Sequence, residues 1–246
     1  PRFTLSHSSA LFSATLSPWN YYGDMLGLPD NTAWVDIASP FVAEQLTVHV
    51  AANISTRFQH RAASAVPIAT LIARQYHQTP GNYLAFFSSF DYLEQVVALF
   101  EQLYPDIPVW RQPRRMAEAE REQFLDRFTL ESRGIGFAVL GGSFGEGIDL
   151  PGARLIGAFI ATLGLPQMNP VNEEIRKRMQ ALFGSGYDYT YLFPGMQKVV
   201  QAAGRVIRTE SDEGVVYLID DRFGQHEVRD LLPRWWHVDQ LSRPDS

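Results

Sequence analysis

Short apolar runs alternate with longer amphipathic segments along most of the chain, and this order limits the fold more than any other sequence feature. Such an order is typical of βαβ units, in which helices join parallel strands and cover the sheet. Runs rich in Val, Ile, Phe and Tyr predict strands at residues 10–16, 46–52, 83–87, 107–111, 135–140, 155–161 and 215–219. Apolar residues at helical spacing predict helices at residues 56–78, 90–104, 117–130, 173–183 and 196–208. We therefore expect an α/β fold in three layers, with a mainly parallel central sheet and helices on both faces.

The composition favours a globular protein without thiol chemistry. The 246 residues are 46% apolar, which is enough for a sizeable core. The formal net charge of -6 argues against bulk attraction to nucleic acid but leaves room for a local basic groove. Cysteine is absent and the six histidines show no metal spacing, so no metal site is expected. No apolar run reaches the roughly 18 residues that cross a bilayer, so we expect a soluble, cytoplasmic protein with no membrane partner.

The stretch QAAGRVIR, residues 201–208, is a candidate anion site. On a helix, Gln201, Arg205 and Arg208 share one face, because offsets of four and seven residues return close to the starting angle. One amide and two guanidinium groups on one face predict binding to negatively charged oxygens. All but two of the 21 basic residues are arginines, yet the chain has no GxxxxGK[ST] phosphate-binding loop.

A glycine-rich loop, GGSFGEGIDLPG at residues 141–152, directly follows one predicted strand. Its glycines allow the backbone to approach a ligand closely and expose amide donors toward it. The loop lacks the Lys-Ser/Thr end of a P-loop and continues into Ile-Asp-Leu-Pro rather than a helix. A purely structural βα turn fits it equally well. Glu146 and Asp149 are candidates to cap amides, contact a ribose hydroxyl or hold an arginine.

Polar residues also follow two other predicted strands. Ser88 and Ser89 stand where a helix begins, so they either bind phosphate or only cap that helix. Asp220 and Asp221 end the strand at residues 215–219, but a magnesium-binding strand would need a phosphate loop upstream. We expect these two acids and Arg222 to orient one another and the neighbouring arginine segment.

The order of these motifs resembles that of superfamily 2 helicases. In the order of helicase motifs III, IV, V and VI, the stretches are SATLSP at residues 13–18, the serines at 88–89, the loop at 141–152 and QAAGRVIR. With Ser39-Pro40-Phe41 and Asp221-Arg222-Phe223, their spelling resembles the DinG/XPD family of DNA helicases, nearest to its bacterial members. The resemblance covers nearly the whole chain. It implies a RecA-like fold and an ATP-dependent 5′–3′ DNA helicase in which two such domains enclose ATP and single-stranded DNA crosses both.

The resemblance also implies roles for individual residues. Motif III would couple ATP hydrolysis to DNA movement through Ser13, Ala14 and Thr15. Motif IV and the start of motif V would contact nucleic acid through Ser88, Ser89, Gly142, Ser143 and Phe144. The rest of motif V would face the nucleotide and motif VI with Glu146, Gly147 and Asp149. Motif VI would reach the γ-phosphate of ATP across the cleft with Gln201, Arg205 and Arg208. Asp221 and Arg222 would support these groups.

On this pattern the chain is part of a longer protein, as its start at Pro1 rather than Met also indicates. Residues 1–30 would be the end of the first motor domain with motif III and a linker, residues 31–241 the second RecA-like motor domain, and residues 242–246 a tail. ATP and Mg²⁺ would be bound mainly by the first motor domain of the same polypeptide, since Walker A and the DEAH-type motif are absent here. This chain alone is therefore expected to be inactive. An iron–sulfur cluster is compatible with the upstream part, whereas none fits this chain.

Two other functions stay open at this point. The same fold without catalysis would serve as a docking module for DNA or protein. The motifs also fit an RNA motor, because they do not distinguish DNA from RNA.

Overall fold

The structure is a computed structural model that describes residues 6–144 and 148–241, and its compact units span residues 1–36 and 37–246. In the first unit, helix α1 (Trp19–Leu26) ends at Gly27, which adopts a left-handed conformation with φ of 60°. The strand predicted at residues 10–16 is wrong, because this segment is largely exposed and has no regular structure. Its apolar run finds no neighbouring strand among the described residues, so its backbone has no ladder to join. The tail predicted at residues 242–246 lies outside the described residues.

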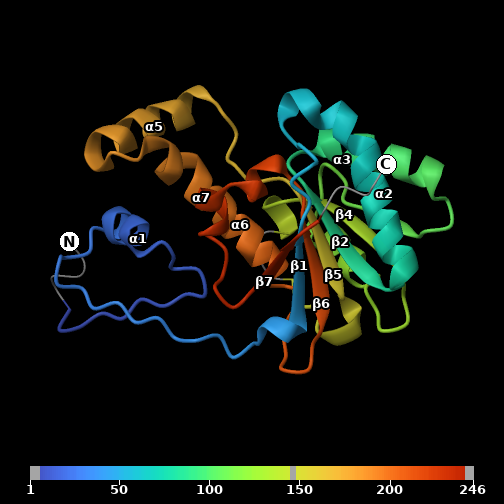
Figure 1. Cartoon of the computed structure of the whole chain (residues 1–246), viewed down its shortest axis with the longest axis horizontal. Helices are drawn as coiled ribbons and strands as arrows, with labels where there is room; N and C mark the ends of the chain where they lie inside the picture. Colours follow the sequence, from blue (N-terminus) through green and yellow to red (C-terminus); the bar gives the residue numbers. More distant parts are fainter. Residues whose placement is uncertain (1–5, 145–147, 242–246) are drawn as a thin grey trace. The chain divides into compact units, whose positions relative to one another are not determined.

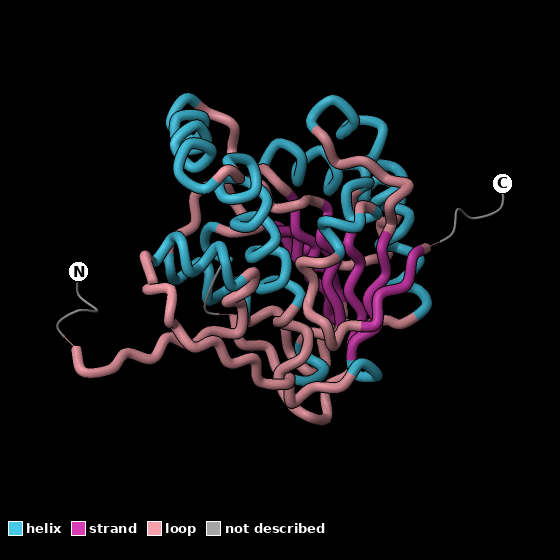
Figure 2. Tube along the Cα trace, turned by 60° about the vertical axis from the view of Figure 1, so that its left-hand side comes forward, coloured by secondary structure: helices cyan, strands magenta, loops and turns pink. Residues whose placement is uncertain are grey.

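The second unit contains one sheet of seven parallel strands (Figure 2). Across the sheet the order is β3-β4-β2-β5-β6-β1-β7, which confirms the predicted α/β fold. The strands are β1 (Leu46–Val50), β2 (Asn82–Phe87), β3 (Val109–Arg111), β4 (Gly134–Val139), β5 (Gly157–Ala161), β6 (Gly214–Leu218) and β7 (His237–Gln240). The first six match predicted strands within about two residues, whereas β7 is an additional edge strand beside β1.

Helices cover both faces of this sheet (Figure 1). The described helices of the unit are α2 (Arg61–Gln78), α3 (Phe90–Leu103), α4 (Glu118–Leu125), α5 (Pro170–Phe183), α6 (Phe193–Ala203) and α7 (His226–Arg229). α2 and α3 bury their apolar side chains against one face, and α4, α6 and α7 contribute to the core on the other. β2 shows why both faces must be covered, since Leu84 and Phe86 join one core while Tyr83 and Phe87 join the other. Short 3-10 turns lie at residues 43–45, 58–60, 142–144, 152–154 and 221–224, and a π-helical turn at 188–192 precedes α6.

The helix predicted at residues 196–208 ends five residues early, at Ala203. The amides of Gly204, Arg205 and Val206 still donate to carbonyls of the last turn, but those of Arg205 and Val206 do so at the tighter three-residue spacing. Val206 and the next residue, Ile207, are both buried and belong to the core on this face of the sheet. Only Gln201 of the three predicted anion-binding residues therefore lies on α6.

Candidate functional site

The predicted site residues of the second unit fall into two groups near opposite ends of the parallel strands, which are called the carboxyl edge and the amino edge below. Because the strands are parallel, Ser88 and Asp220 follow β2 and β6 at the carboxyl edge. The segment of Arg205 and Arg208 precedes β6 and contacts the residue before β1, so it lies near the amino edge.

Two guanidinium groups meet at one backbone carbonyl near the amino edge. Nη1 of Arg205 donates to the carbonyl oxygen of Ile148 at 3.2 Å, and Nη2 of Arg208 donates to the same oxygen at 2.7 Å. Arg205 is buried, with 5% of its surface exposed, whereas 35% of the Arg208 side chain is exposed. Asp149, on the exposed side of the loop, approaches Nε of Arg208 to 3.8 Å. The structure thus brings the predicted motif V and motif VI residues together without a shared helix face.

A tight turn after Arg208 holds this arginine in place. Oδ2 of Asp212 accepts from the backbone amides of Arg208 and Thr209 at 2.7 and 2.8 Å. Nε2 of Gln45 donates to the carbonyls of Thr209, Glu210 and Asp212 from across the sheet edge. Burial raises the pKa of the Asp212 carboxyl, but the hydrogen bonds from Thr209 and the backbone amides outweigh burial, so its pKa lies below the ordinary value. Neither Asp212 nor Gln45 was predicted, although Ser211 and Asp212 are residue types that are common in turns.

The glycine-rich loop begins with two residues in the left-handed backbone conformation. Gly141 and Gly142 have φ of 85° and 57°, a region that disfavours other residues, so glycine is required for the turn after β4. Phe144 is 1% exposed and packs on Phe124 with ring centroids 4.8 Å apart. The predicted contact of the Phe144 side chain with nucleic acid does not fit this burial, because the ring has no free face. Residues 145–147, which include Glu146 and Gly147, lie outside the described residues, and of Ser143 only the backbone is described.

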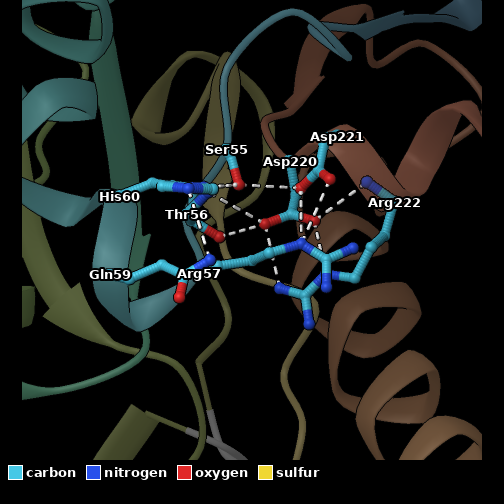
Figure 3. Close-up of polar contacts among 8 residues, drawn as sticks. All are labelled: Ser55, Thr56, Arg57, Gln59, His60, Asp220, Asp221 and Arg222. Carbon is cyan, nitrogen blue, oxygen red and sulfur yellow. Dashed lines mark hydrogen bonds and ion pairs between the residues drawn. The ribbon is translucent and has the colours of Figure 1, made fainter.

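A fully buried carboxylate organises the carboxyl edge (Figure 3). Asp220 has no exposed surface and accepts from Arg222 through the backbone amide at 3.0 Å, Nε at 2.6 Å and Nη2 at 2.9 Å. It also accepts from the amide and the hydroxyl of Thr56. Burial raises the pKa of Asp220, but Arg222 and Thr56 overcome this effect, so its pKa is lowered. Burial alone would lower the pKa of Arg222, and the paired carboxylate raises it instead.

The neighbouring carboxylate is more exposed and bonds to the segment after β1. Asp221 accepts from the hydroxyl of Ser55 at 3.0 Å and from Nε of Arg57 at 3.1 Å (Figure 3). Nδ1 of His60 lies 3.0 Å from the same Ser55 hydroxyl. The acids therefore tie β6 to the segment between β1 and α2, rather than to the arginine segment that the sequence indicated. With its oxygens occupied by five donors, Asp220 has no room for a metal ion. No cluster of His, Asp and Glu suited to a metal occurs in the described part of the chain.

An unpredicted arginine, Arg61, holds both serines after β2. Nη2 of Arg61 donates to the hydroxyl of Ser88 at 2.8 Å, and Nη1 donates to that of Ser89 at 3.4 Å. Ser89 caps α3 by accepting from the amide of Tyr92 at 3.3 Å, which confirms the capping alternative for this residue. Ser88 is exposed. Arg61 stands 27 residues before Ser88, so no local pattern in the sequence could link them.

Comparison with known proteins identifies the family. The model of the helicase C-terminal domain matches residues 72–239, which include β2 to β6, Ser88, the arginine segment and Asp220. The chain belongs to the helicase C-terminal domain family. This membership accounts for the motif order along the sequence, and the predicted resemblance to the DinG/XPD helicases is confirmed. The nearness to bacterial members stays a prediction.

The relatives of this helicase domain are longer DNA helicases. The chain is 26% identical to the general transcription and DNA repair factor IIH helicase subunit XPD of Dictyostelium discoideum, over 96% of the chain and 32% of the relative. It is 30% identical to the ATP-dependent DNA helicase chl-1 of Caenorhabditis elegans, over 68% of the chain and 21% of the relative. The structure titled XPD_APO matches with a TM-score of 0.74 and 18% identity, over 93% of this chain and 47% of that one, which establishes the RecA-like helicase fold. The chain thus spans about a third or less of the curated relatives.

The remaining predicted residues of the helicase motifs form no described hydrogen bond to either group. Ser13, Ala14 and Thr15 belong to the first unit, where the Ser13 hydroxyl accepts from the Thr15 amide at 3.2 Å. Gln201 lies partly buried in the last turn of α6. No helix in the described residues is both long and apolar enough to cross a membrane.

Proposed function

We propose that this chain is the C-terminal motor domain of an ATP-dependent DNA helicase that moves 5′ to 3′ along single-stranded DNA. In this proposal ATP and Mg²⁺ are held mainly by a first motor domain of the same polypeptide. Arg205, Arg208 and Gln201 complete the site from the second domain, and Glu146, Gly147 and Asp149 border the nucleotide. The first unit, with Ser13 to Thr15, couples hydrolysis to DNA movement.

The convergence of two guanidinium groups on the carbonyl of Ile148 carries the proposal. The carbonyl fixes the position of both guanidinium groups, and the carboxylate of Asp149 approaches Arg208 only to 3.8 Å. Phosphoryl transfer develops negative charge on the γ-phosphate oxygens, and an arginine supplied by a second domain stabilises that charge only when the domains close. Closure is thereby coupled to the state of the nucleotide, as in other hinge-closing motors.

The exposed fractions separate the roles of the two arginines. Arg208 can reach a phosphate from its present position, because 35% of its side chain is exposed and its backbone is anchored by Asp212. Arg205 is 5% exposed, so its guanidinium acts mainly by holding the Ile148 carbonyl and through it Arg208. In the proposal both contribute, and Arg208 is the group that contacts the γ-phosphate.

The carboxyl edge of the sheet would bind DNA. Ser88 and the glycine loop, through Gly142 and Ser143, stand where β2 and β4 end, and hydroxyls with free amides favour backbone phosphates. Asp221 supports this edge by tying β6 to Ser55 in the segment after β1, and Arg222 supports it by holding Asp220, which accepts from Thr56.

The test measures DNA-stimulated ATP hydrolysis in the protein that includes the first motor domain. Arg208→Ala is expected to lower the rate on the order of a thousandfold while DNA affinity stays unchanged. Arg205→Ala should also lower the rate, and its melting temperature should fall because a buried hydrogen-bonded group is lost. Arg133→Ala is a matched control, since Arg133 is exposed just before β4.

Near-normal DNA-stimulated ATP hydrolysis in both arginine variants would contradict the proposal that these arginines act on the γ-phosphate. A wild-type protein that binds DNA but hydrolyses no ATP would instead support the docking module. Stimulation by single-stranded RNA above that by DNA would make it an RNA motor.

A further inference from the structure

We propose that Phe58, Arg61 and Ser88 form a contact site for one nucleotide of a single strand, in which Arg61 and Ser88 hold the phosphate and Phe58 stacks on the base. This inference rests on the proposed function and names side chains that act in DNA binding. Two of them, Phe58 and Arg61, belong to none of the helicase motifs recognised in the sequence.

The guanidinium group of Arg61 is held in place and has more N–H donors than its described hydrogen bonds use. Its Cζ lies 5.2 Å from the ring centroids of both Phe58 and Tyr92, so two aromatic rings hold the guanidinium group. Tyr92 is itself fixed, since it is 1% exposed and its hydroxyl lies 2.5 Å from that of Ser64. A guanidinium group has five N–H donors, and its described hydrogen bonds run to Ser88 and Ser89 alone.

No acid neutralises Arg61 among residues 6–144 and 148–241. The nearby carboxylates are each engaged elsewhere. Asp220 pairs with Arg222, Asp221 with Arg57 and Asp91 with Arg114. The positive charge of Arg61 is therefore available beside the exposed hydroxyl of Ser88, and a phosphodiester is the anion that takes donors of both kinds.

Phe58 explains why the ligand should carry a base. Its side chain is 84% exposed, although a phenyl ring gains stability from burial, and it forms part of the short turn that leads into α2. An exposed aromatic ring beside a phosphate-binding cation is the arrangement by which proteins bind single strands without sequence preference. Duplex DNA would not present an unstacked base to this ring, so the site is specific for single strands.

The experiment measures the fluorescence anisotropy of labelled strands with the full-length protein, without nucleotide and over a series of salt concentrations. One strand is oligodeoxythymidylate, and the other has the same backbone length with abasic residues. Phe58→Ala should weaken binding of oligodeoxythymidylate about 10-fold and leave the abasic strand within about twofold of wild type. Because Phe58 is exposed, its removal should not disturb folding.

Arg61→Gln should weaken binding of both strands and lower the slope of log affinity against log salt by about 0.7, the value for one phosphate contact on a single strand. Arg61→Lys keeps the charge, so it should keep the wild-type slope even where its affinity falls. Arg133→Gln is the matched control and should behave as wild type.

Three results would overturn the inference. Wild-type affinity and salt slope in both Phe58→Ala and Arg61→Gln would do so while leaving the helicase proposal intact, provided the wild type binds single strands. An Arg61→Gln protein with lower affinity but an unchanged salt slope would show that Arg61 only supports the fold. A wild-type protein that binds neither strand and whose ATP hydrolysis is not stimulated by DNA would overturn the proposed function as well.

Discussion

Replacing Asp220 by Asn should destabilise the second unit more than any change at the neighbouring acid. Asp220 accepts five hydrogen bonds with no exposed surface, and its partner Arg222 is only 15% exposed. An amide keeps one acceptor oxygen, so whichever way it turns, at least two donors meet an NH₂ group. Breaking a buried ion pair in this way costs about 3–5 kcal/mol, because the remaining charge is left uncompensated.

The assay is thermal and urea unfolding of wild type and Asp220→Asn. For a unit of this size, about 3–5 kcal/mol corresponds to a melting temperature lower by roughly 6–20 °C. Asp221→Asn is the matched control, since its ion pair with Arg57 is 37% and 42% exposed and should contribute less than about 1 kcal/mol. Adding Arg222→Met to Asp220→Asn should recover part of the loss, because the orphaned charge is removed. Equal destabilisation by Asp220→Asn and Asp221→Asn would refute the reasoning.

The same pair makes a definite contribution to the pH dependence of stability. The pKa of Asp220 is lower in the folded state than in the unfolded chain, so the folded state binds fewer protons in acid. The stabilisation is fully present above about pH 4, the ordinary carboxyl value, and is lost as the pH falls through the lower pKa of the folded state. Asp220→Asn should therefore show a smaller fall in stability between neutral and acid pH than wild type, whereas an unchanged slope would contradict the assignment.

Two further changes test the packing of the loop after β5 against α6 and the turn after Arg208. Gly164→Ala should cost about 2–4 kcal/mol by urea unfolding, because Gly164 has φ of 69° and a Cβ would lie 2.6 Å from the carbonyl oxygen of Gly195; a loss below about 0.5 kcal/mol would contradict this packing. Asp212→Ala should cost about 1–2 kcal/mol and lower DNA-stimulated ATP hydrolysis, since the backbone amides of Arg208 and Thr209 lose their shared acceptor. Normal hydrolysis with reduced stability would show that the turn does not position Arg208.

Most of the sheet could be predicted because its strands are buried on both faces. β2 and β5 are buried at every position, so their apolar runs stand out from the polar segments around them. β7 was missed for the opposite reason. It is an edge strand with mostly exposed residues, and only its pairing with β1 makes it a strand. The apolar segment at residues 10–16 was predicted as a strand, but without a partner in the described structure it forms none.

The candidate site was predicted less completely than the fold, because its contacts join residues far apart in the chain. Ser88 and Ser89 were found from their position after a strand, whereas Arg61 is brought to them by the packing of α2 against α3. Asp220 and Arg222 are neighbours in the sequence and were expected to interact, but their link to Thr56 spans 164 residues. Sequence patterns show local periodicity and adjacency, and they carry no signal for such long-range hydrogen bonds.

QAAGRVIR illustrates this division most clearly. The types of its residues predict an anion site, and the motif order was sufficient to predict the helicase family, which the comparison confirms. The predicted helical face with Gln201, Arg205 and Arg208 is not formed, because α6 ends at Ala203, before both arginines. The arginines are aligned instead by a shared acceptor, the carbonyl of Ile148, and by a turn that Asp212 and Gln45 hold. Local propensity favours a longer helix, but burial of apolar surface and distant hydrogen bonds stabilise the turn, and they form only when the whole sheet is assembled.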